Sequence, residues 1–137
     1  MIAHAADGRV TTTLVTGASA HAREQAIARA LLRGRTAELS DLQQNLPPAI
    51  ILEGLAPGSS PLDTLDSSQA LMARIAPGCL CCTGNLVLRV TLNRLLRQRP
   101  RRIFIGVADS EHLDQLRSWL RSEPYDQLLR LTSDLNA

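Results

Sequence analysis

At 137 residues the chain is long enough for one domain with a single hydrophobic core, and its net charge of +2 is too small to indicate a polyanionic partner. One Trp, one Tyr and one Phe cannot form the stacking platforms of proteins that bind single-stranded nucleic acid. No apolar run approaches the ~20 residues that cross a membrane, so we expect neither a nucleic-acid nor a membrane partner.

Predicted strands and helices alternate along the chain. In chain order, we predict a strand over 11–16, a helix over 23–32, a short helix over 39–46, strands over 49–52 and 71–76, a helix over 84–99, a strand over 102–107, a helix after residue 109, and a helical turn or a last strand over 125–131. Residues 1–9 are expected to form a flexible tail and residues 10–137 a single domain. Alternation of this kind predicts an α/β fold with a mainly parallel sheet flanked by helices.

The segment after the first predicted strand has the position of a phosphate-binding loop. The usual pattern is G-x-x-x-x-G-K-[ST], and Gly17 matches its first glycine. Ala22 takes the place of the second glycine, Arg23 that of the lysine, and Glu24 that of the hydroxyl that binds magnesium. The helix N-terminus still favours an anion, but a carboxylate at Glu24 opposes a magnesium–triphosphate complex.

All three cysteines lie within four positions, at Cys79, Cys81 and Cys82. Clustered thiolates favour a soft metal such as zinc or copper(I). Cys79 and Cys82 also form a C-x-x-C pair suited to thiol-redox chemistry, and inert buried cysteines are the third interpretation. Three thiols leave a tetrahedral zinc ion one ligand short. Besides a second subunit, the candidates for the fourth ligand are Glu53, Asp63, Asp66, His21 and His112. The cluster is not a secreted disulfide framework, so we expect a cytoplasmic protein.

The motif Gly-Cys-x-Cys-Cys at residues 78–82, followed by an amphipathic helix and a buried strand, resembles the CobW-type metallochaperone GTPases. Proteins of that family have a P-loop, bind metal, commonly zinc, through C-x-C-C, and couple nucleotide state to metal delivery. The resemblance covers residues 78–109, with 11–32 as the phosphate-loop part, and implies a three-layer P-loop NTPase-like domain. The metal-binding residues that it implies are Cys79, Cys81 and Cys82, and those at or near the phosphate loop are Gly17, Ser19 and Arg23.

Three parts of the family's GTPase apparatus are altered or absent. The phosphate loop lacks its Lys and its Ser/Thr, and the strand over 102–107 continues through Gly106 to Asp109 without the family's Glu-Thr-x-Gly. The guanine-reading Asn-Lys-x-Asp is impossible in a chain whose fifteen basic residues are all arginine. Because phosphoryl transfer depends on these groups, we do not expect ordinary GTP hydrolysis.

The leading hypothesis is a metal-binding protein, for zinc or another soft ion, on a degenerate CobW-like fold. Its partners would be the metal ion and a client metalloprotein. The alternatives are a protein that binds or hydrolyses GTP or ATP weakly, a thiol-redox protein, and a scaffold. An unpaired sheet edge would also allow a homodimer. Four arginines at the C-terminal end of the helix over 84–99 are interpreted as complements of its dipole rather than as a phosphate patch. They are Arg97, Arg99, Arg101 and Arg102.

Overall fold

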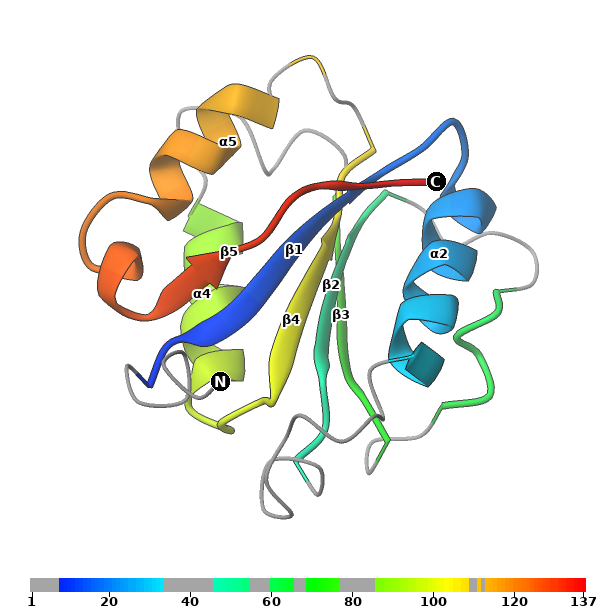
Figure 1. Cartoon of the computed structure of the whole chain (residues 1–137), viewed down its shortest axis with the longest axis horizontal. Helices are drawn as coiled ribbons and strands as arrows, with labels where there is room; N and C mark the ends of the chain where they lie inside the picture. The colour runs from blue at the N-terminus through cyan, green and yellow to red at the C-terminus, as the bar shows by residue number, and fades with distance from the viewer. Residues whose placement is uncertain are drawn as a thin grey trace.

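The computed structural model describes residues 8–33, 46–54, 60–65, 69–76, 86–108, 111 and 113–137. The strands are β1 (Val10–Thr16), β2 (Ala49–Glu53), β3 (Leu71–Ile75), β4 (Arg102–Gly106), β5 (Leu129–Leu131) and β6 (Leu135–Asn136). The helices are α2 (Ala20–Arg33), α4 (Leu86–Leu96) and α5 (Leu113–Leu120), with a 3-10 turn, η2 (Tyr125–Gln127), before β5. The sheet forms the middle layer, with α2 on one side and α4 and α5 on the other (Figure 1).

The strands are ordered β3-β2-β4-β1-β5, and β6 pairs with the last two residues of β1, Val15 and Thr16. Every pair in this sheet is parallel. The predicted α/β class with a mainly parallel sheet flanked by helices is therefore confirmed. No helix among the described residues is long and apolar enough to cross a membrane.

Side chains of the central strands alternate between two hydrophobic clusters, as the pleat of a strand requires. On the side of α4 and α5, the cluster includes Leu14, Ile51, Ile103 and Ile105 from the strands and Leu88, Leu92, Leu116 and Leu120 from the helices. On the side of α2, it includes Val15, Ile50, Leu52, Phe104, Ile27 and Leu31. Burial on both faces explains why β2 is apolar up to Glu53 and why β4 is apolar after Arg102.

Helix α2 begins at Ala20, three residues before the predicted start. The cause is Ser19, whose Oγ accepts a hydrogen bond from the Ala22 N–H at 3.0 Å, while its carbonyl accepts the first helical bond from the Arg23 N–H. This is an N-cap, and it leaves only residues 17–19 as a loop after β1. The helix extends to Arg33, one residue beyond the predicted end.

The C-terminal part of the chain adds more strand than was predicted. Of the two interpretations for 125–131, the structure has both, since η2 is followed directly by β5. Tyr125 is buried beside Trp119, with ring centroids 4.8 Å apart, and its hydroxyl donates to Asn93 Oδ1 at 2.8 Å. Burial raises the pKa of Tyr125, against the smaller opposing effects of Arg89 and of the bond to Asn93. Residues 1–7 of the predicted tail and residues 39–45 of the predicted short helix lie outside the described residues.

Candidate functional site

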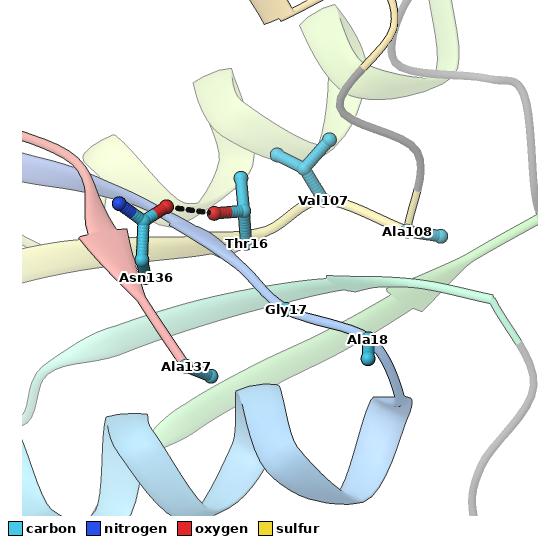
Figure 2. A pocket seen from close by; sticks show the side chains of 7 residues that line it. All are labelled: Thr16, Gly17, Ala18, Val107, Ala108, Asn136 and Ala137. Carbon is cyan, nitrogen blue, oxygen red and sulfur yellow. Dashed lines mark hydrogen bonds between the residues drawn. The ribbon is translucent and has the colours of Figure 1, made fainter.

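A pocket of about 450 Å³ lies at the carboxyl ends of β1 and β4 (Figure 2). Three segments form its walls, namely the end of β1 with the loop that follows, the residues after β4, and the end of β6. The lining residues are Thr16, Gly17, Ala18, Val107, Ala108, Asn136 and Ala137. The lining therefore consists of backbone groups and small uncharged side chains.

The position of this pocket follows from the strand order. The connection from β1 through α2 leads to β2, on the far side of β4, whereas the connection from β4 through α5 leads to β5, on the far side of β1. Two neighbouring strands thus send their connections in opposite directions. In open α/β sheets, ligands bind in the crevice at the carboxyl ends of such strands. The fold itself therefore marks this pocket as a candidate binding site.

The end of β6 closes one side of the pocket. Asn136 Oδ1 accepts a hydrogen bond from the Thr16 hydroxyl, and the Ala137 N–H donates to the Thr16 carbonyl at 2.7 Å (Figure 2). A Cβ atom on Gly17 would lie 2.7 Å from the Ala137 Cβ and 3.2 Å from the Arg23 Cγ. Gly17 therefore allows β6 and α2 to approach the loop closely.

Arg23, the residue in place of the phosphate-loop lysine, is buried. Its Nη1 donates to the Gly17 carbonyl at 2.8 Å. The guanidinium thus holds the loop through a bond within the chain, instead of extending into the pocket. Of the three residues taken as candidates for cofactor binding, Gly17 alone lines the pocket. Ser19 caps α2, and Arg23 donates a hydrogen bond to the loop.

Glu24, in place of the magnesium-binding hydroxyl, has a partner that the sequence did not reveal. Its side chain is 2% exposed and forms a bidentate ion pair with Arg74 of β3, with N–O distances of 3.0 and 3.1 Å. The Ser60 hydroxyl also donates to Glu24 Oε1. From the sequence we expected the Glu24 carboxylate to oppose a bound magnesium–triphosphate complex. In the structure its negative charge is instead compensated by Arg74. Nothing in the local sequence connects these three residues, which are far apart in the chain.

A second buried carboxylate joins β2 to the pocket. Glu53, at the end of β2, accepts a hydrogen bond at Oε1 from the Ala108 N–H at 2.8 Å. Ala108 lines the pocket at the end of β4. One of the acids considered as a fourth metal ligand is therefore already used to position the pocket wall.

The three thiols fall outside the described residues, as do Asp66 and His112. Among the residues that are described, no group of three or more His, Cys, Asp or Glu side chains could hold a metal ion. Asp63 accepts the Ser60 N–H at 2.9 Å in a turn, and His21 is exposed in the first turn of α2. The thiols nevertheless belong to the connection that leaves β3 at Ile75 and enters α4 at Leu86.

The four arginines after α4 do not form one basic patch. Arg97 and Arg99 are exposed, whereas Arg102 lies over the Phe104 ring at 4.1 Å and donates to Thr13 Oγ1 at 3.2 Å. Burial lowers the pKa of Arg102, and the charge of Arg101 adds to the effect. Arg102 is thus a partly buried component of the sheet surface.

Comparison with known proteins gives a match for part of the chain. No protein-family model matches, and no solved structure matches. One curated protein is informative. The chain is similar to a zinc chaperone. The relative is the zinc chaperone YeiR of Escherichia coli (strain K12), with 36% identity over 72 residues.

The matched region is 52% of this chain and 22% of the YeiR chain, so the similarity spans about a fifth of that relative's length. A relative named as a zinc chaperone agrees with the resemblance to metallochaperones given above.

Proposed function

We propose that this protein binds zinc through Cys79, Cys81 and Cys82 and transfers the ion to a client metalloprotein, without ordinary GTP hydrolysis. The similarity to a zinc chaperone is the observation that carries the proposal. The thiol cluster supplies the chemistry, because zinc prefers thiolate and imidazole ligands. A CobW-type origin accounts for the glycine loop and the thiol motif together.

The topology supports a link between the thiols and the pocket. All strands of the sheet are parallel, so their carboxyl ends meet at one edge. The thiol segment leaves β3 at that edge, and the pocket lies at the same edge between β1 and β4. A metal held by the thiols and a ligand in the pocket would therefore act on one side of the molecule.

The test is the zinc content of the purified protein. We expect close to one zinc ion per chain, by elemental mass spectrometry on untagged protein prepared anaerobically without chelator, because three thiolates and one further ligand complete a tetrahedral site. Copper at the same ratio would keep the thiol site and change the metal. A chain that stays metal-free after reconstitution with zinc would contradict the proposal.

The second candidate is weak nucleotide binding, which the pocket at the switch point favours. We expect no affinity for GTP or ATP tighter than millimolar, because Arg23 is bound to Gly17 and Glu24 is bound to Arg74. Titration calorimetry with each nucleotide and magnesium measures this directly. Binding in the micromolar range would show that the pocket accepts a triphosphate without the usual lysine.

A further inference from the structure

The outer side of α4 begins with an apolar patch. Leu86 is 63% exposed and Val90 is 57% exposed, and Val87 beside them is also exposed. The opposite side of the helix is anchored in the core by Leu88 and Leu92, which are fully buried. The orientation of α4 is therefore fixed by its core side, and the apolar patch is left facing solvent.

Two arginines continue this patch along the helix. At about 100° per residue, Leu86, Val90, Arg94 and Arg97 lie within one arc of about 100°. The Arg97 N–H donates to the Asn93 carbonyl at 3.2 Å, so the helical path extends to Arg97. Among the described residues neither arginine has an acidic partner. The surface thus passes from apolar to basic along one stripe.

The stripe starts close to the thiols along the chain. Leu86 comes four positions after Cys82, and a fully extended chain spans at most about 14 Å over four residues. A protein seated on the stripe would consequently have its contact surface within about 14 Å of one thiol. No such restriction links the thiols to α2, which lies on the other side of the sheet (Figure 1).

We propose that the stripe formed by Leu86, Val87, Val90, Arg94 and Arg97 is the docking surface for a protein partner that presents apolar side chains flanked by carboxylates. The proposal rests on the metal-transfer role, and it assigns the surface on which the recipient sits. Charge complementarity selects an acidic partner, because the two arginines, which have no acidic partner in the described part of the chain, attract carboxylates and repel basic proteins.

Two other occupants fit the stripe less well. An anionic membrane surface gains only about 1 kcal/mol per arginine, and of the Trp, Phe and Leu side chains that interfacial helices insert the stripe has only Leu86. In a two-fold dimer each stripe would face a second copy of itself, which offers no acid to either arginine. An acidic protein is therefore the occupant that the described residues favour.

The probe is a synthetic amphipathic helical peptide with leucines at helical spacing flanked by glutamates, labelled for fluorescence anisotropy. A second peptide has each glutamate replaced by lysine, and a third has each leucine replaced by serine. We expect the first peptide to bind and the other two to bind at least about tenfold more weakly, with affinity for the first falling as salt rises.

Variants locate the binding on α4. L86S/V90S and R94E/R97E should each weaken binding of the first peptide at least about tenfold. The matched controls lie on α2, where Leu32 is 72% exposed and stands near the exposed Arg29 and Arg33. L32S and R29E/R33E should change binding less than about twofold. Circular dichroism of each variant confirms that the helices are retained.

Equal binding of all three peptides, no binding of any, or the same affinity in the α4 variants would overturn the proposal. Binding to phosphatidylserine–phosphatidylcholine vesicles that R94E/R97E abolishes, without any effect on peptide binding, would also overturn it. So would a homodimer that dissociates only in the α4 variants. Peptide binding by the triple Cys→Ser variant, together with the zinc content of the α4 variants, separates failure of docking from failure of metal binding.

Discussion

Replacing Cys79, Cys81 and Cys82 together with serine is expected to remove the bound zinc, from near one ion per chain to none. A serine hydroxyl does not ionise at neutral pH, so the variant has no anionic soft ligand. Each single variant should lower zinc affinity at least about 100-fold, since changing even the neighbours of metal ligands costs about 10–100-fold. Competition with a chromophoric chelator measures these affinities.

The same titration should depend strongly on pH. Thiols with an ordinary pKa of about 8.5 must lose their protons to bind zinc, so affinity should fall as the pH is lowered from 8 to 6. H21A and D63N test whether either of these exposed side chains is the fourth ligand, since an unchanged zinc affinity would exclude it. Unchanged zinc in the triple variant would disprove the thiol site. A metal-free protein with a reversible Cys79–Cys82 disulfide would favour the redox interpretation.

Removing Arg74 should destabilise the fold more than any change at an exposed ion pair. Glu24 is 2% exposed, and among the described residues R74M would leave its buried carboxylate with only the Ser60 hydroxyl as a donor. Loss of one partner from a buried pair costs about 3–5 kcal/mol of unfolding free energy. E24Q should cost less, about 1–3 kcal/mol, because the Arg74 side chain is 28% exposed and keeps contact with water.

Urea unfolding monitored by circular dichroism gives these free energies. The double variant E24L/R74M should be more stable than R74M alone, since it removes both charges. The control is D114N in α5, because Asp114 pairs with Arg117 but is 98% exposed. That pair should contribute about 0–1 kcal/mol. An R74M variant as stable as D114N would show that the buried pair has no structural role.

Much of the fold could be predicted because the core strands are short, apolar and bounded by breakers. The run Ala49–Glu53 is apolar until its last residue, and its period of two has no polar face, which indicates a strand covered on both sides. The two-residue strand β6 could not be predicted, since its hydrogen bonds to β1 are long-range. The early start of α2 was signalled by Ser19, whose capping role was overlooked in favour of the phosphate-loop pattern.

The candidate site was less predictable, for a physical reason. Position relative to a motif indicated what Arg23 and Glu24 replace, but not what they contact. Glu24 meets Arg74, which is fifty residues away, and Arg23 turns back to Gly17. Tertiary pairs of this kind depend on the strand order, which a local pattern does not contain. The thiol ligands stay a prediction, because they lie outside the described residues.

The bond from Arg23 to the Gly17 carbonyl has a consequence in the cell. A protein whose loop is held by a nucleotide becomes more stable as the nucleotide concentration rises, by mass action. Here the group that holds the loop is the Arg23 guanidinium, which is part of the chain, so this stabilisation does not depend on the concentration of a ligand. The folded fraction of this protein should therefore not change with the nucleotide concentration.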